Sequence, residues 1–270
     1  MAYRLFEGKG HASIYQKYRF TPPTELKNII IEYLDKKKGQ PHVLAVDLGC
    51  GTGQNTRLLA PCFQKVVGID ISDCQLEEAR AVPGYPNITY SKGPAEELPF
   101  PDGSVDLLTA ASAAHWFDRE KFFVEANRVL KPRGCIALLG FSDPNTKLKY
   151  KDCGDKLDHI YQGVKRVLAP YTSNPAIEAE GKLEGVFSAI PFPDKERIES
   201  FRVKNLISVR HLLGFIETWS MFQGYKKKDP KSAEDLLVNT QKRFLDEMGV
   251  TSLDTEIEQH FEYFCLLASK

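Results

Sequence analysis

Short apolar runs alternate with amphipathic segments along the first half of the chain. The runs at residues 43–48, 66–70, 87–91, 105–110 and 135–141 predict strands, because apolar runs of this length between turn residues are typical of buried strands. The intervening segments repeat apolar residues at helical spacing, as in Phe122, Phe123, Ala126 and Val129. Repeated strand–helix units predict an α/β fold with a doubly wound, mainly parallel sheet.

The pattern changes after residue 141. Residues 142–198 hold one clear amphipathic helix at 155–168, followed by loops with several prolines. Residues 199–207 predict a sixth strand, 209–223 and 232–248 predict helices, and 259–268 predict a final apolar strand. Near the start of the chain, Thr21-Pro22-Pro23 predicts the beginning of a helix, with Thr21 as its N-cap.

Composition excludes several classes of protein. The apolar share of 42% is ordinary for a soluble globular chain, and the net charge of zero gives no reason to expect nucleic acid or an anionic membrane as partner. No apolar run reaches the ~18 residues of a membrane span, and the N-terminus lacks the apolar core of a signal peptide. Six scattered cysteines without a C-x-x-C pair indicate a reduced, cytoplasmic protein. We expect no metal site and a monomer or weak dimer.

The stretch VLAVDLGCGTG at residues 43–53 carries the clearest chemistry. Its strand reaches Asp47, and Gly49, Gly51 and Gly53 follow at alternate positions. Such a loop allows backbone to approach a ligand closely, because glycine has no Cβ. The next strand ends in Asp70, close to the ~20-residue spacing expected for an acid that holds ribose hydroxyls. The sequence therefore predicts a nucleoside-cofactor site, with a ligand-free glycine turn as the alternative.

Two local details qualify this prediction. The dinucleotide pattern G-x-G-x-x-G fails, because Gln54 or Thr56 stands where its last glycine would fall. Ser72-x-x-Gln75 has the form of a capping box for the helix after the second strand. Asp70 therefore has an alternative role as a helix-capping acid.

The D-x-G-x-G-x-G form resembles motif I of the class I S-adenosylmethionine-dependent methyltransferases. Over residues 40–141 the chain is similar to the methyltransferase type-11 group, and three segments favour its trans-aconitate methyltransferase-like branch: YQKYRFTPP, AASAAHWFDREKFFVEANRVLKPRG and FIETWS. The resemblance implies a Rossmann-like, seven-stranded sheet whose last strand is antiparallel and lies between strands five and six. It also implies one domain over residues 1–270: an N-terminal lid and helix (1–39), a cofactor-binding core (40–141), an inserted helical cap (142–198) and the C-terminal part of the sheet (199–270).

The resemblance further implies S-adenosylmethionine as cofactor and S-adenosylhomocysteine as product. Each implied contact belongs to one part of the cofactor. The three glycines flank its methionine and ribose, Asp70 accepts from the ribose hydroxyls, and Ile71 packs on the adenine. Because Pro94 replaces an acid that is common in relatives, Ala95 and Glu96 recognise the adenine. Ala111 offers its backbone to the methionine, and Tyr18 of the lid shields the sulfonium.

The loop after the fourth strand would face the site of methyl transfer. His115 there is a candidate general base, an orienting donor or a packed neutral histidine, and Trp116 is a pocket wall or a core residue. Tyr15, Arg19 and Trp219 are candidates for substrate binding, with Arg19 holding a carboxylate. The alternative for the N-terminal segment is an arm packed on the surface.

These features predict methyl transfer to a small-molecule acceptor. A carboxylate oxygen of a trans-aconitate-like acid is favoured, because a carboxylate is already ionised at neutral pH and the sequence offers one base candidate, His115. The alternatives are C- or O-methylation of a quinone-like or other apolar molecule, and a non-catalytic protein that binds S-adenosylmethionine.

Overall fold

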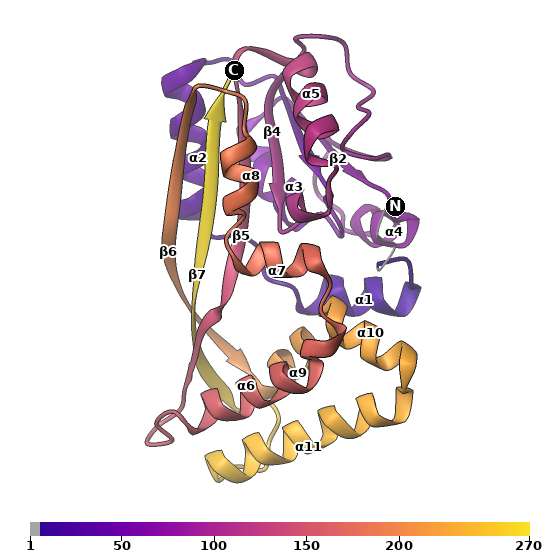
Figure 1. The fold of residues 1–270 in the computed structure, drawn as a ribbon, viewed down its shortest axis with the longest axis vertical. Helices are drawn as coiled ribbons and strands as arrows, with labels where there is room; N and C mark the ends of the chain where they lie inside the picture. The colour runs from indigo at the N-terminus through magenta and orange to yellow at the C-terminus, as the bar shows by residue number, and fades with distance from the viewer. Residues whose placement is uncertain (1–5) are drawn as a thin grey trace.

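A seven-stranded sheet forms the centre of the molecule (Figure 1). The computed structural model describes residues 6–270 apart from the side chain of Glu178, so the first five residues of the predicted lid lie outside the described residues. The strand order is β3-β2-β1-β4-β5-β7-β6. The strands are β1 (Leu44–Leu48), β2 (Lys65–Asp70), β3 (Ile88–Lys92), β4 (Val105–Ala111), β5 (Leu130–Lys149), β6 (Asp194–Ser208) and β7 (Glu256–Ser269).

The pairing confirms the predicted doubly wound, mainly parallel sheet. Strands β1 to β5 pair in parallel, whereas β7 is antiparallel to both β5 and β6 and lies between them. β5 is much longer than the predicted 135–141, because it stays paired with β7 as far as Lys149, with an irregularity between Ser142 and Lys147. That extension is polar, so the apolar pattern did not reveal it.

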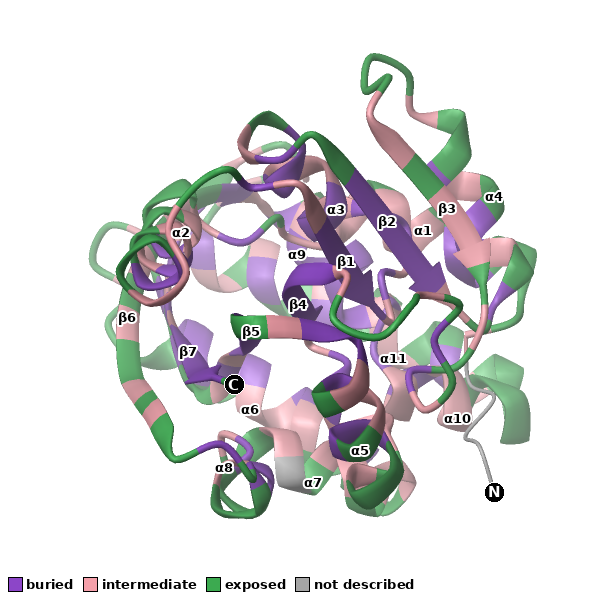
Figure 2. Cartoon of the chain, turned by 90° about the horizontal axis from the view of Figure 1, so that it is seen from above, coloured by how far each residue is buried: buried purple, intermediate pink, exposed green. Residues whose placement is uncertain are grey.

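Helices cover both faces of the sheet. Alternate strand residues face opposite sides, so Val46 contributes to the core beneath α5 (Arg119–Val129) and α8 (Glu184–Ala189), whereas Ala45 contributes to the core beneath α2 (Thr24–Lys37). Figure 2 shows β1, β2 and β4 largely buried, with exposed residues on the outer faces of the helices and along the edge strand β6. The remaining elements that flank the sheet are α3 (Gln54–Leu59), η1 (Ala60–Cys62), α4 (Asp73–Ala81), η2 (Ala114–Trp116) and α7 (Asn174–Glu180). The short helix η3 (Ala169–Tyr171) instead packs against α6 (Lys156–Leu168) and α10 (Ser220–Lys228).

A separate helical layer lies beyond the carboxyl ends of the parallel strands (Figure 1). It consists of α6 (Lys156–Leu168), α9 (Val209–Glu217), α10 (Ser220–Lys228) and α11 (Pro230–Met248), which share a core of their own. α8 does not join this layer, because Val186 packs in the core of the sheet. The segment predicted as one inserted cap is thus divided between two packing environments, and the domain boundaries stay a prediction.

Helix α1 (Lys9–Tyr18) lies between the sheet and this helical layer (Figure 1). It packs against α4 on one side and α9 on the other. Two side chains fix it to the end of α9: His11 Nε2 lies 2.9 Å from the carbonyl oxygen of Thr218, and Arg19 Nε donates to Thr218 Oγ1 at 2.8 Å. The N-terminal segment is therefore attached to the helical layer.

The buried carboxylate of Asp47 joins three elements at the end of β1. Its oxygens accept hydrogen bonds from Asn55 Nδ2 at 2.7 Å, Thr56 Oγ1 at 2.6 Å and Thr109 Oγ1 at 2.9 Å. Burial raises the pKa of Asp47, and the donors from Thr56, Asn55 and Thr109 oppose that rise. The carboxylate thereby ties the start of α3 and the middle of β4 to β1, on either side of the glycine loop.

Replacing Asp47 with alanine should destabilise the fold. Asp47→Ala leaves buried donors on Asn55 and Thr56 without their acceptor, and we expect the free energy of unfolding to fall by about 1–3 kcal/mol. Urea unfolding followed by circular dichroism measures this change. Asp235→Ala is the control, because its side chain is 57% exposed and its ion pair with Lys231 spans 3.8 Å. Equal stabilities of the two variants would contradict the role of Asp47.

Candidate functional site

The backbone of the glycine loop requires its three glycines. Gly49, Gly51 and Gly53 have φ of +58°, +54° and +86°, in the left-handed region that side chains with a Cβ rarely adopt. A Cβ on Gly49 would lie 2.5 Å from Cβ of Ala113, and one on Gly53 would lie 2.3 Å from the hydroxyl of Tyr90. Glycine therefore allows the loop after β1 to approach the loop after β4.

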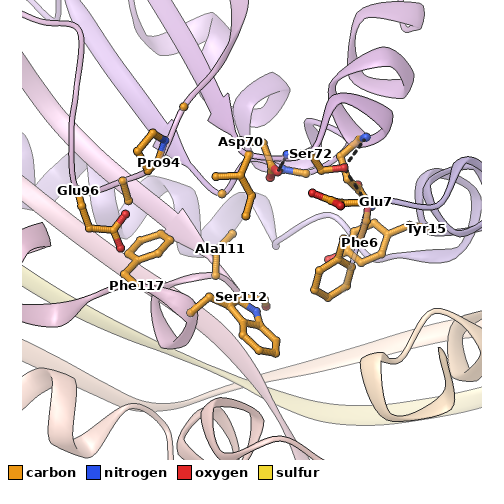
Figure 3. A pocket seen from close by; sticks show the side chains of 18 residues that line it. Phe6, Glu7, Tyr15, Asp70, Ser72, Pro94, Glu96, Ala111, Ser112 and Phe117 are labelled. Atoms are coloured by element: carbon orange, nitrogen blue, oxygen red, sulfur yellow. Dashed lines mark hydrogen bonds between the residues drawn. The ribbon is translucent and has the colours of Figure 1, made fainter. Parts of the chain in front are cut away.

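A cavity opens beside this loop at the carboxyl ends of β1, β2 and β4, and we call it the glycine-loop cavity. In Figure 3, Asp70, Ser72 and Phe6 lie on one side of it, and Pro94 and Glu96 on the other. This is the place where open α/β sheets bind ligands, since neighbouring connections leave the sheet on opposite faces there. Most of the predicted cofactor residues line it: Gly49, Gly51, Asp70, Ile71, Ala95, Glu96 and Ala111.

Asp70 holds the loop and the next helix at the same time. Its Oδ2 accepts from the backbone N–H of Gly51 at 2.8 Å, and its Oδ1 accepts from Ser72 at 2.9 Å. Burial raises the pKa of Asp70, and the N–H groups of Ser72 and Gly51 oppose that rise. Each carboxylate oxygen can accept a further hydrogen bond, so Asp70 can receive ligand hydroxyls while it holds the loop.

Two predicted cofactor residues lie elsewhere. Gly53 caps the start of α3, beside Tyr90 and outside the cavity lining. Tyr18 packs its ring against Gly214 of α9 and meets the edge of His211 at 5.4 Å between ring centroids. The structure therefore does not bring Tyr18 to the cavity, because the helical turn of α1 directs it towards the helical layer.

The N-terminal segment covers the open side of the cavity. Ser72 Oγ donates to the carbonyl oxygen of Phe6 at 2.8 Å, which fixes the segment above the start of α4 (Figure 3). The ring of Phe6 meets Trp116 edge-on at 6.1 Å and Tyr15 at 5.9 Å. These aromatic contacts join the N-terminal segment to the loop after β4.

A second cavity, which we call the Arg19 cavity, shares part of its wall with the first. Phe6, Tyr15, Ser112 and Trp116 line both. The predicted catalytic and substrate residues come together in the Arg19 cavity: His115, Trp116, Tyr15, Arg19 and Trp219. A smaller hollow lined by Asp47, Gln54 and Tyr15 adjoins both cavities.

Arg19 has a fixed position on the wall of its cavity. Its guanidinium lies 4.7 Å from the ring centroid of Tyr15 and 5.2 Å from that of Phe215, and its Nε donates to Thr218. Among the side chains that the structure describes, no carboxylate forms an ion pair with it. Two acids, Asp143 and Glu180, also line the cavity, but both pair with Lys165, at 2.8 and 3.4 Å.

His115 is uncharged at neutral pH. Burial lowers its pKa to about 4, and the positive charge of Arg19 lowers it further in the same direction. Its ring stacks at an angle on Trp116, with centroids 4.8 Å apart. A neutral imidazole with this pKa can orient a ligand by hydrogen bonding but is a weak general base at pH 7.

Sequence reasoning missed several residues that line the cavities. Phe6 and Ser112 border both, and Gln75 and Asp143 border one each. Ser112 has a φ of +53°, a strained turn for which its sequence gave no sign. Gln75 was assigned to a capping box, but the backbone N–H of Ser72 is bonded to Asp70 instead. Asp143 lies in the polar extension of β5, whose strand character the apolar pattern could not reveal.

The glycine-loop cavity fits a nucleoside cofactor. Ile71 is 38% exposed on its wall, where an aromatic ring would cover it. The amide of Gln75 lines the same cavity, is 2% exposed and has no hydrogen-bond partner. A buried polar group without a partner is costly, so both side chains indicate a site shaped for a ligand with an apolar ring and polar groups.

Comparison with known proteins relates the chain to methyltransferases. Residues 46–138 match the family model described as "Methyltransferase domain", the type-11 group. The chain is 27% identical over 265 residues to a methyltransferase of Dictyostelium discoideum, covering 95% of this chain and 92% of the relative. It is 24% identical over 253 residues to a protein of Saccharomyces cerevisiae named as an S-adenosylmethionine-dependent methyltransferase, covering 84% and 86%.

Solved structures show the same fold. A type II methyltransferase from Anaeromyxobacter dehalogenans superposes with a TM-score of 0.71 at 23% identity, covering 93% of this chain and 98% of that one. The YcgJ protein of Bacillus subtilis gives a TM-score of 0.51 at 21% identity, covering 90% and 98%. The fold is that of a class I methyltransferase. Residues 46–138 form a methyltransferase domain, and the named relatives support S-adenosylmethionine-dependent methyl transfer as the activity.

Between residues 6 and 270, no helix is long and apolar enough to cross a membrane. The same residues contain no group of three or more His, Cys, Asp or Glu side chains that could hold a metal ion.

Loss of the Asp70 carboxylate should weaken cofactor binding. Asp70→Asn keeps the shape but removes the charge that ribose hydroxyls would meet, and we expect S-adenosylhomocysteine to bind about 10-fold more weakly or worse. Isothermal titration calorimetry measures the dissociation constant. Asp73→Asn is the control, since its exposed carboxylate pairs with Lys92 outside the cavity. Undiminished affinity in Asp70→Asn would exclude this contact.

The lowered pKa of His115 makes stability depend on pH. The unfolded state takes up the proton near pH 6.5, whereas the folded state takes it up at about pH 4, so stability is lost as the pH falls below about 6.5. Between pH 7 and pH 5, we expect the wild type to lose about 2 kcal/mol more than His115→Gln. Urea unfolding at both pH values tests this, and equal losses would mean that His115 titrates normally.

Proposed function

We propose that this enzyme methylates a carboxylate oxygen of a small organic acid, as the trans-aconitate resemblance suggests. One observation carries the proposal: the Arg19 guanidinium lines the cavity beside the glycine-loop cavity and has no carboxylate partner among the residues described. A fixed guanidinium binds a carboxylate through two parallel hydrogen bonds. Its charge would otherwise remain partly buried and uncompensated.

The position of Arg19 suits an acceptor that must be oriented. When bound, S-adenosylmethionine would supply an electrophilic methyl group to the acceptor oxygen, and Asp70 and the glycine loop would hold the cofactor. Tyr15 and Phe215 sandwich the guanidinium, and Thr218 holds its Nε. This fixed geometry positions an acid next to the wall that the two cavities share, which is the main contribution an enzyme makes to such a reaction.

The state of His115 agrees with a carboxylate acceptor. Burial lowers the pKa of His115 to about 4, so this residue is a weak base at neutral pH. A phenol, an amine or a carbon acid needs a base of higher pKa, whereas a carboxylate needs none. His115 is then an orienting neighbour of the acceptor, and Trp116 and Trp219 form apolar walls that exclude water.

The test uses methyl-labelled S-adenosylmethionine and a panel of di- and tricarboxylates, with trans-aconitate included, beside quinols and phenols. We expect the label to pass to an acid and to be released as methanol by alkali, because methyl esters are alkali-labile. Label that passes to a quinol or phenol, or that survives alkali, would contradict the proposal. No transfer to any acceptor despite cofactor binding would favour a non-catalytic role.

Arg19→Gln should separate acceptor binding from cofactor binding. We expect KM for the acid to rise about 10-fold or more, because a charge-assisted pair is lost. The affinity for S-adenosylhomocysteine should change little, since Arg19 does not line the glycine-loop cavity. Arg202→Gln is the control, with a side chain that is 90% exposed on β6. An unchanged KM in Arg19→Gln would refute the carboxylate contact.

A further inference from the structure

Gln75 is an unpartnered buried amide on the wall of the glycine-loop cavity. It lies in the first turn of α4 and is 2% exposed. Neither its Nε2 nor its Oε1 has a hydrogen-bond partner. Leaving a buried amide unpaired costs about 1–3 kcal/mol, so the position is unfavourable unless a ligand completes it.

The capping hydrogen bond that the spacing predicts for Gln75 is made by another residue. In a capping box, the Gln75 side chain would accept from the backbone N–H of Ser72. That N–H donates to Asp70 Oδ1 at 2.9 Å instead. The Ser72 hydroxyl still accepts from the backbone N–H of Gln75, at 3.3 Å. The helix is therefore capped without the Gln75 side chain, which stays directed at the cavity.

Gln75 and Asp70 border the same part of the cavity. A Cβ built on Gly51 would lie 3.4 Å from Gln75 Oε1, so the amide lies directly over the glycine loop. The backbone N–H of that same Gly51 donates to Asp70 Oδ2 at 2.8 Å. Gly51 thus lies beside both side chains, and all three residues line the cavity.

The two side chains offer complementary hydrogen bonds. An ionised carboxylate accepts only, whereas a primary amide donates two hydrogen bonds and also accepts. A ribose diol needs both kinds of partner, because each hydroxyl donates one hydrogen bond and its oxygen accepts others. Asp70 alone leaves the hydroxyl oxygens without a donor. We propose that Gln75 is a second ribose-binding residue, whose amide donates to a hydroxyl oxygen of the diol that Asp70 accepts from.

The proposal depends on the cofactor class and is independent of the acceptor. It also predicts opposite effects on the free and the bound protein. Gln75→Met keeps the length of the side chain but removes the unpaired amide. The free protein should therefore unfold at the same temperature as the wild type or higher. The same variant should bind S-adenosylhomocysteine about 10-fold more weakly, because the ligand loses its donor.

The experiment is isothermal titration with S-adenosylhomocysteine and with its 2′-deoxy and 3′-deoxy analogues. We expect the wild type to lose affinity on removal of at least one hydroxyl, and Gln75→Met to show a smaller loss for that analogue, since the contact is already absent. Gln75→Glu should not restore affinity, because it replaces the donor with an acceptor. Gln64→Met, an exposed glutamine before β2, is the matched control.

Three results would overturn the proposal. The first is a Gln75→Met protein that binds S-adenosylhomocysteine as tightly as the wild type. The second is a wild type that binds both deoxy analogues as tightly as S-adenosylhomocysteine. This measurement does not depend on the folding of any variant. The third is an equal loss for each ligand in Gln75→Met, which would place its contact away from the ribose.

Discussion

The buried carboxylate of Asp47 is the constraint on which the site depends. Glycine residues can adopt many backbone conformations, so the three left-handed glycines do not by themselves select one conformation of the loop. The hydrogen bonds that Asp47 accepts from Asn55, Thr56 and Thr109 fix the loop conformation, because they join both sides of the loop to β1. Asp70 then holds the centre of the loop through Gly51. Two acids on neighbouring strands therefore shape the cavity before any ligand enters.

Helix α1 makes the two cavities interdependent. Tyr15 lines both of them, and Arg19 lines the second while it is bonded to Thr218 of the helical layer. Displacing α1 would also move Arg19, which we propose as the carboxylate-binding residue. The proposed acceptor site is consequently complete only when the N-terminal segment lies over the glycine-loop cavity.

The sequence predicted the core of this structure well because its signals there are local. Buried strands, a glycine loop and Asp70 each follow from a few adjacent residues, and the resemblance supplied the place of β7. The sequence patterns failed where contacts between distant elements determine the position of a side chain or the length of a strand. Tyr18 turns away from the cavity because Gly214 of α9 leaves room for its ring. Gln75 faces the cavity because Asp70, two residues before Ser72, accepts from the backbone N–H that Gln75 would accept from in a capping box. β5 extends to Lys149 because β7 pairs with it, although its own residues there are polar.

The position of β7 has a consequence for synthesis on the ribosome. β6 pairs with β7 alone in the sheet, and β7 also completes the far side of β5, yet three helices, α9 to α11, separate it from β6 in the chain. Until β7 emerges, β5 is an open edge and β6 has no place to dock. An open strand edge is a template for pairing with other chains. The edges of β5 and β6 are therefore open to pairing with other chains while the helical layer is being made.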